Sequence, residues 1–197
     1  MDGNHISYSL RSDGRRYFTN ADMAEMVTRG LIDPDDRWEL IRGEWFDMPS
    51  EGYEHMTVRT VLNMIFSAAL GWPSDYRVNS EGSFFFSQDI ELRPDLAIYR
   101  ADVGTNEMAG DDLFLVAEVM KSSRRRDMDL KRPIYAEIGV AELWLIDLDE
   151  GTITVCRDPE AGAYRTVNVA RADEAVNALA FPDVSVSLDM LRGSTGD

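Results

Sequence analysis

The pattern of hydrophobic and polar positions predicts a chain in which helices and strands are mixed. Apolar residues recur at helical spacing over residues 21–29 and 54–70, and Gly30 and Gly71 follow where each helix would end. Two apolar runs, residues 113–120 and 139–148, are typical of buried strands. A helical segment at about residues 127–138 separates them, and Pro133 predicts a late start or a kink in it.

Shorter patterns complete a predicted sheet. Residues 38–48 indicate a hairpin with a tight turn at Arg42-Gly43, and residues 152–169 indicate a second hairpin. Strand candidates flank Glu81-Gly82, and LRPDLAIY at residues 92–99 is expected to be one strand with Pro94 at its mouth. The order helix, hairpin, helix, strands, helix, strand, hairpin predicts an α/β fold with a mixed sheet rather than a regular βαβ array.

Length and composition indicate one domain. We expect residues 1–17 to be flexible and residues 18–197 to form a single domain, because no linker, repeat or low-complexity tract divides them. No apolar run approaches the roughly 20 residues that span a bilayer, and the first residues lack the apolar core of a signal peptide. A single cysteine, Cys156, excludes an internal disulfide. These features predict a cytoplasmic protein with no membrane partner.

The charge balance is strongly acidic. A formal net charge of -16 argues against broad, charge-driven binding of nucleic acid. A local basic cluster runs against this balance, and it consists of Lys121, residues 124–126, Lys131 and Arg132. The cluster is either one wall of a basic groove or a solvated surface turn, and composition alone leaves both interpretations open.

The candidate chemistry rests on two acids in apolar strands, Asp95 and Glu118. An acid in a buried strand is costly unless a positive group meets it. Two carboxylates with a nearby lysine are the parts of a metal-dependent phosphodiesterase site, because hard cations such as magnesium prefer oxygen ligands. The simpler alternatives are an exposed strand-end carboxylate for Asp95 and a structural salt bridge from Glu118 to Arg124 or Lys131.

Two lysines compete for the position beside Glu118. Lys121 lies three residues along the strand, so alternation turns it to the opposite face. Lys131 lies on the following helix with Asp127 and Tyr135 at four-residue spacing, so these three side chains share one face. We therefore predict that Lys131 reaches Glu118, with Tyr135 and Asp127 in support. The alternatives are an exposed helix lysine and a tyrosine that only packs in the core.

Several segments resemble one known family. RPDLAIY, LVAEVMKSS, the D-x-x-x-K-x-x-x-Y spacing and GVAELWLID are similar to the Uma-type family of putative restriction endonucleases, which belongs to the PD-(D/E)XK nuclease superfamily. Pro94-Asp95 matches the family's PD, and Glu118 matches the acid of its E-x-K element, with the lysine relocated to Lys131. The family usually has a serine-proline-type segment after this acid, whereas Lys121 intervenes here. Upstream and downstream segments extend the resemblance over residues 18–192.

The resemblance implies a restriction-endonuclease-like core, a mixed central sheet flanked by helices. It implies magnesium, with manganese as an alternative, at Asp95 and Glu118, and DNA as the substrate. Glu39 and His55 are further candidates for the site: the superfamily often places an acid on its first core helix, and the family has a helix-opening histidine. For His55 the simpler alternative is a surface or capping residue.

The sequence therefore predicts a magnesium-dependent endonuclease that hydrolyses DNA phosphodiester bonds. Two alternatives stay open. One is an interaction protein on a nuclease scaffold whose protein partner supplies the DNA contacts, which the acidic charge favours. The other is a hydrolase of a different phosphate ester. A homodimer would place two active sites on the two strands of DNA.

Overall fold

The computed structural model describes residues 9–10, 14, 16–48, 50–121 and 125–193, with the backbone alone at residues 9, 10 and 125–128. It divides into two compact units. Unit 1 comprises Met1–Ser50, Ser83–Arg93 and Thr105–Met108, and unit 2 comprises Glu51–Gly82, Pro94–Gly104 and Ala109–Asp197. The single domain expected from residue 18 stays a prediction. The expected flexibility of residues 1–17 falls mostly outside the described residues, within which β1 (Ser9–Leu10) pairs with β2 (Arg16–Tyr17).

Unit 1 is a small antiparallel sheet with one helix. Its strands lie in the order β4 (Glu44–Asp47), β3 (Trp38–Ile41), β7 (Ile90–Leu92) and β6 (Phe84–Ser87). The predicted hairpin is confirmed, with Arg42 and Gly43 both at positive φ in its turn. Helix α1 (Asn20–Thr28) begins at Thr19, whose side chain and that of Asp22 form a capping box. Met23 of this helix packs with the apolar residues of β3.

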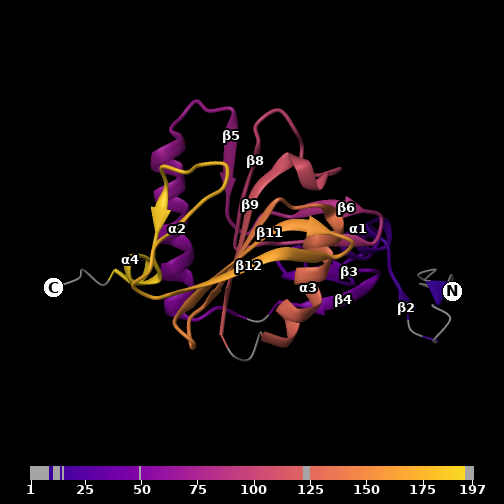
Figure 1. Cartoon of the computed structure of the whole chain (residues 1–197). Helices are drawn as coiled ribbons and strands as arrows, with labels where there is room; N and C mark the ends of the chain where they lie inside the picture. Colours follow the sequence, from indigo (N-terminus) through magenta and orange to yellow (C-terminus); the bar gives the residue numbers. More distant parts are fainter. Residues whose placement is uncertain (1–8, 11–13, 15, 49, 122–124, 194–197) are drawn as a thin grey trace, which may run out of the picture. The chain divides into compact units, whose positions relative to one another are not determined.

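Unit 2 is built on a six-stranded mixed sheet (Figure 1). The strand order is β12 (Ala163–Arg171), β11 (Thr152–Glu160), β10 (Glu142–Asp147), β9 (Leu113–Met120), β8 (Leu96–Arg100) and β5 (Tyr76–Asn79). The pair β9–β10 is parallel, and the other described neighbours in this sheet are antiparallel. Parallel neighbours require a crossover, and α3 (Arg125–Ile138) supplies it with Pro133 inside the helix. The predicted mixed sheet is therefore confirmed.

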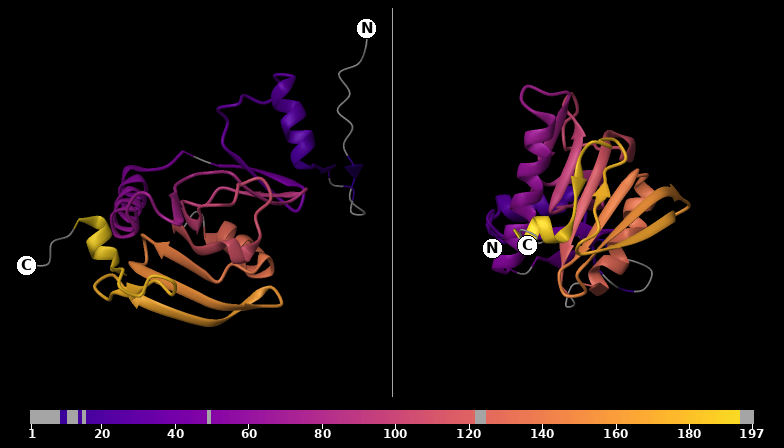
Figure 2. Two further views of the ribbon diagram at one scale, coloured as in Figure 1. Left: turned by 90° about the horizontal axis from the view of Figure 1, so that it is seen from above. Right: turned by 60° about the vertical axis from the view of Figure 1, so that its left-hand side comes forward.

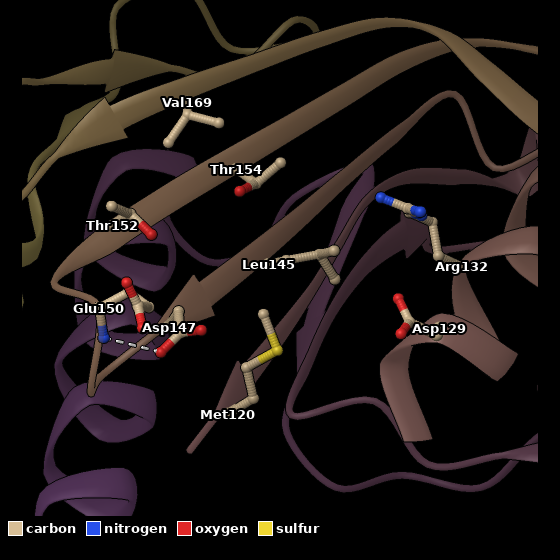
Figure 3. Close-up of a pocket in the computed structure, with 9 residues that line it drawn as sticks. All are labelled: Met120, Asp129, Arg132, Leu145, Asp147, Glu150, Thr152, Thr154 and Val169. Carbon is tan, nitrogen blue, oxygen red and sulfur yellow. Dashed lines mark hydrogen bonds between the residues drawn. The ribbon is translucent and has the colours of Figure 1, made fainter. Parts of the chain in front are cut away.

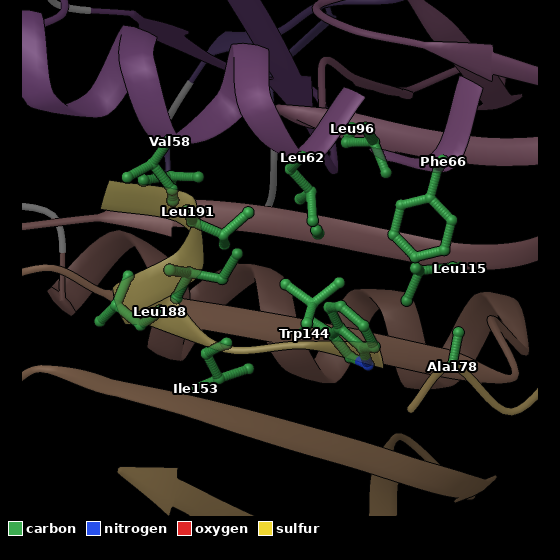
Figure 4. Close-up of a cluster of buried hydrophobic side chains, with 14 of the residues drawn as sticks. Val58, Leu62, Phe66, Leu96, Leu115, Trp144, Ile153, Ala178, Leu188 and Leu191 are labelled. Carbon is green, nitrogen blue, oxygen red and sulfur yellow. The ribbon is translucent and has the colours of Figure 1, made fainter. Parts of the chain in front are cut away.

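Helices cover both faces of this sheet, and successive side chains of β9 point to the two faces in turn. Leu115, Ala117 and Val119 point into a core with α2 (Tyr53–Leu70) and α4 (Leu188–Arg192), in which Trp144 and Phe66 pack together (Figure 4). Glu118 points to the other face, where α3 lies. Figure 2 shows α4 beside α2 near the C-terminus. The short elements η1 (Gly110–Asp112), β13 (Val176–Asn177) and β14 (Ser185–Val186) complete the described part of the unit.

One expected strand is interrupted. LRPDLAIY was predicted as continuous, but β7 ends at Leu92 and β8 begins at Leu96, and the two belong to different sheets. Pro94 lies between them. Proline has no backbone N–H to donate and a fixed φ, so it does not fit inside a central strand. Because of this break, Asp95 lies just before β8 and outside its hydrogen-bonded ladder.

Candidate active site

Asp95 directly precedes β8, and Glu118 lies near the end of the neighbouring strand β9. In the antiparallel pair β8–β9, Leu96 is opposite Ala117, so continuing the register by one residue places Asp95 opposite Glu118. Each of the two acids is only 4% exposed. A carboxylate with so little access to water requires positive groups or hydrogen-bond donors around it.

Helix α3 supplies the donors at Glu118. The hydroxyl of Tyr135 donates to Glu118 Oε1 at 2.6 Å, and Lys131 Nζ lies 3.4 Å from the same oxygen. Lys131 is 7% exposed and Tyr135 is fully buried. Their four-residue spacing therefore brings both onto the face of α3 that meets Glu118, as the sequence indicated. The side chain of Asp127, their expected companion, and Arg124 lie outside what the structure describes.

Lys121 lies at a different carboxylate. Its Nζ is 3.0 Å from Glu54 Oε2, and its side chain is about half exposed. The hydrogen bond from Lys121 is the main cause that lowers the pKa of Glu54, and Arg192 adds to it at 3.1 Å. Of the two competing lysines, Lys131 is therefore the one that the structure places beside Glu118.

Asp95 is held by the backbone of β9 and by a histidine of α2. Asp95 Oδ2 accepts the N–H of Val119 at 2.7 Å, and His55 Nε2 lies 2.8 Å from the Val119 carbonyl oxygen and 3.2 Å from Asp95 Oδ2. Because β8 begins only at Leu96, these side chains meet the Val119 peptide groups where the pairing of the two strands ends. His55 is 3% exposed, so it is no surface residue.

The surroundings of His55 favour its charged form. Its Nδ1 lies 3.2 Å from Glu51 Oε2, while Nε2 faces a carbonyl and a carboxylate. Oxygens therefore face both ring nitrogens, and this arrangement favours a proton on each of them. Burial alone would lower the pKa of His55, but hydrogen bonds to Asp95 and Glu51 outweigh it and raise that pKa to about 9.

Two residues that the sequence reasoning did not select, Glu51 and Arg59, belong to the same cluster. Arg59 Nη1 lies 2.5 Å from Glu51 Oε2, 2.8 Å from Glu81 Oε1 and 3.8 Å from Asp95 Oδ1. Ligand atoms of Glu51, His55 and Asp95 all lie within 4.8 Å of one another, so this trio could hold a metal ion. The signal was that Glu51, His55 and Arg59 follow one another at four-residue intervals, with Glu51 just before α2 and the other two on the helix.

Glu39, the remaining candidate, lies in unit 1. It is 3% exposed on β3, and its Oε1 accepts the backbone N–H of Arg93 at 2.9 Å. The other five candidates, Asp95, Glu118, Lys131, Tyr135 and His55, all belong to unit 2. Within unit 2 they form two groups that meet at β9, one around Glu118 and one around Asp95.

A pocket of about 380 Å³ lies on the α3 face of the sheet beside Glu118 (Figure 3). Its floor includes Leu145, the cross-strand partner of Glu118, and Met120, two residues further along β9. Arg132 of α3 lines one side and Asp147 the other, where Asp147 Oδ1 accepts the N–H of Glu150 at 3.0 Å. None of the candidate site residues that the structure describes lines this pocket.

Comparison with solved structures confirms the class of fold. A crystal structure described as a putative nuclease from Anabaena variabilis ATCC 29413 superposes with a TM-score of 0.73 and 16% sequence identity, over 90% of this chain and 98% of that chain. At this identity the likeness shows a shared fold: mixed α/β with a central mixed sheet and flanking helices. No curated protein matches the chain.

The family model named Uma2 and described as putative restriction endonuclease matches residues 23–190. The chain therefore belongs to this family, which confirms the resemblance drawn from its motifs. Among the residues that the structure describes, no helix is both long and apolar enough to cross a membrane.

Proposed function

We propose that this chain is a metal-dependent endonuclease that hydrolyses phosphodiester bonds in DNA. One observation carries the proposal: Glu118 is buried in a central strand, and one oxygen of its carboxylate contacts both Lys131 and Tyr135. A buried acid with specific charged and hydrogen-bonding partners is typical of an active site. Membership of a family described as putative restriction endonuclease supports DNA as the substrate.

Asp95 and Glu118 are the proposed ligands of Mg²⁺, with Mn²⁺ as the alternative ion. Their carboxylate oxygens suit a hard cation, and Glu51 adds a third carboxylate next to Asp95. The imidazole of His55 is a less suitable ligand for magnesium, and its Nε2 is already hydrogen-bonded to the Val119 carbonyl oxygen. When bound, the ion would neutralise phosphate charge and lower the pKa of a bound water.

The residues around the two acids have distinct proposed roles. The ammonium of Lys131 offsets negative charge that develops on the phosphate. The hydroxyl of Tyr135 fixes the orientation of Glu118 through its 2.6 Å hydrogen bond. His55 joins Asp95 to the backbone of Val119 and so acts as a positioning residue. The bond between Glu39 and Arg93 N–H supports a structural role in unit 1, and a catalytic role for Glu39 stays a prediction.

A second candidate function is that of an interaction protein on the nuclease fold, with a protein partner that contacts DNA. The net charge of -16 favours it, because a polyanion is repelled by such a chain. Arg59 and the charged His55 also balance the acids around Asp95, so this group is compensated without a metal ion. These two observations make metal binding itself the first quantity to measure.

The test combines calorimetric titration of Mg²⁺ and Mn²⁺ with cleavage of supercoiled plasmid by the full chain, in metal and in EDTA. Asp95→Asn and Glu118→Gln are the site variants, and Glu142→Gln, a buried acid on the next strand, is the matched control. The proposal is supported if wild type and Glu142→Gln cleave in the presence of metal while Asp95→Asn and Glu118→Gln do not. Cleavage of a small aryl phosphodiester but not DNA would indicate another ester substrate. Metal binding without any cleavage would favour the interaction protein, and no metal binding would overturn the site.

A further inference from the structure

Helix α2 presents to solvent a face that carries no charged side chain. Its inner face buries Val58, Leu62 and Phe66, and the opposite face bears exposed residues at three- and four-residue spacing. Three large side chains stand out on it: Tyr53 is 81% exposed, Met64 is 63% exposed and Met56 is 43% exposed. Thr60, Ser67 and Ala68 are smaller exposed residues on the same face.

This neutral face contrasts with the rest of the chain. Charged residues make up 28% of the sequence, yet none occurs from Thr60 to Ser74. The charged residues earlier in α2 face elsewhere: Glu54 pairs with Lys121 and Arg192, and Arg59 turns inward to Glu51. Loss of charge together with enrichment in methionine and aromatic residues is the signature of a protein–protein contact, whereas a nucleic acid would require cations.

The order of side-chain sizes along the face is self-complementary. If α2 is paired antiparallel with a copy of itself about a twofold axis level with Leu62, every large side chain on the face meets a small residue. The pairs that this axis produces are Tyr53 with Gly71, Met56 with Ala68, and Met64 with Thr60. A surface that matches itself about a twofold axis is the requirement for an isologous dimer.

We propose that the outer face of α2 is the contact through which two copies of this chain form a reversible dimer. Two chains of net charge -16 repel each other, so a contact free of charge has the lowest electrostatic cost. An 18-residue helix is about 27 Å long and about 10 Å wide, so its outer face offers roughly 270 Å², less than the roughly 800 Å² per partner of a standard interface. We therefore expect the dimer to be weak and reversible. The dimer does not depend on the proposed nuclease activity.

Sedimentation equilibrium of the full chain from about 1 to 200 μM tests the proposal, since this range spans the affinity expected of a small interface. Wild type is expected to shift from monomer to dimer. Met64→Lys is expected to raise the dissociation constant at least about 100-fold, because it buries like charges near the axis. Val169→Lys is the matched control, since Val169 is 62% exposed on β12, away from this face, and this variant should dimerise as wild type does.

A mixing experiment tests the antiparallel register. Thr60→Glu alone should be monomeric, and a mixture of Thr60→Glu with Met64→Lys should dimerise again, because the new opposite charges meet across the axis. Far-ultraviolet circular dichroism establishes that each variant is folded. A monomeric wild type at 200 μM, dimerisation of Met64→Lys as tight as wild type, or a mixture that stays monomeric would each overturn the proposal.

Discussion

Glu118 and Glu142 are buried carboxylates on the neighbouring parallel strands β9 and β10, but they face opposite sides of the sheet and have different partners. Glu142 is fully buried, and its Oε1 accepts the Nε and Nη2 of Arg157 at 2.8 and 2.6 Å and the indole N–H of Trp144 at 3.0 Å. Its Oε2 accepts the N–H of Leu179 at 2.7 Å. Arg157 and Leu179 fasten β11 and the C-terminal segment to β10, whereas the Trp144 indole lies on β10 itself, so we assign Glu142 a structural role.

Glu118 has donors of another kind. A lysine ammonium at 3.4 Å and a tyrosine hydroxyl at 2.6 Å meet the same oxygen, and both come from the single helix α3. The guanidinium of Arg157 is a rigid fork that fixes a carboxylate, whereas a lysine ammonium is a point charge on a flexible stem that can follow a substrate. Both acids are buried, so burial alone does not separate them, and we expect the kind of cation beside each acid to do so.

The largest expected effect is on activity at Glu118. Glu118→Gln keeps the shape and still accepts hydrogen bonds from Tyr135 and Lys131, but it removes a negative ligand of the proposed metal. We expect metal-dependent cleavage by the folded protein to fall at least about 1,000-fold, roughly 4 kcal/mol of transition-state stabilisation, while the lost counter-charge of buried Lys131 lowers stability as well. Plasmid cleavage rates and urea denaturation measure the two quantities. Full activity in this variant would assign Glu118 to the structural class.

Glu142→Gln should lower stability without lowering the cleavage rate. The amide cannot compensate the charge of Arg157, and it loses the charge-assisted hydrogen bonds that hold Leu179. We expect the free energy of unfolding to fall by about 3 kcal/mol, while the cleavage rate of the folded protein stays within about twofold of wild type. Urea denaturation followed by circular dichroism tests the first statement. A large loss of activity in fully folded Glu142→Gln protein would contradict the structural role assigned to Glu142.

The two lysines sharpen the comparison further. Lys131→Met removes the cation beside Glu118, and we expect cleavage to fall about 100-fold. Lys121→Met is the matched variant, because Lys121 is half exposed and pairs with Glu54. An exposed ion pair contributes at most about 1 kcal/mol, so its loss should leave both stability and cleavage close to wild type. Equal loss of activity in both variants would show that Lys121 also acts in the reaction.

The sequence supported the Glu118 group because its geometry is local. Two apolar runs predicted β9 and β10, the crossover helix followed from their order, and four-residue spacing placed Lys131 and Tyr135 on one face of α3. The Asp95 group depended on contacts that no short pattern contains. Glu51, just before α2, and Arg59 of α2 reach Asp95 because α2 packs against β8, and their spacing in the sequence does not indicate this long-range contact.

Glu142 was overlooked for a similar reason. Glu142 stands at the start of an apolar run, and Glu118 stands within one. The local sequence AELWLID therefore contains no pattern that tells a structural acid from a catalytic one. Its partners Arg157 and Leu179 are 15 and 37 residues away along the chain. The break at Pro94 was likewise underestimated, since the change from one sheet to another at Leu92–Leu96 is decided by tertiary pairing rather than by local propensity.

The smallest predicted effect separates orientation from charge at Glu118. Tyr135→Phe removes only the hydroxyl that donates to Glu118 Oε1, because the ring is fully buried and keeps its packing. We expect the free energy of unfolding to fall by about 1 kcal/mol and cleavage to fall about tenfold, since the carboxylate is less firmly oriented but keeps Lys131. The Michaelis constant should change less than kcat, which distinguishes a positioning role from one in binding DNA. A purely structural tyrosine would lower stability by the same amount and leave kcat unchanged in folded protein.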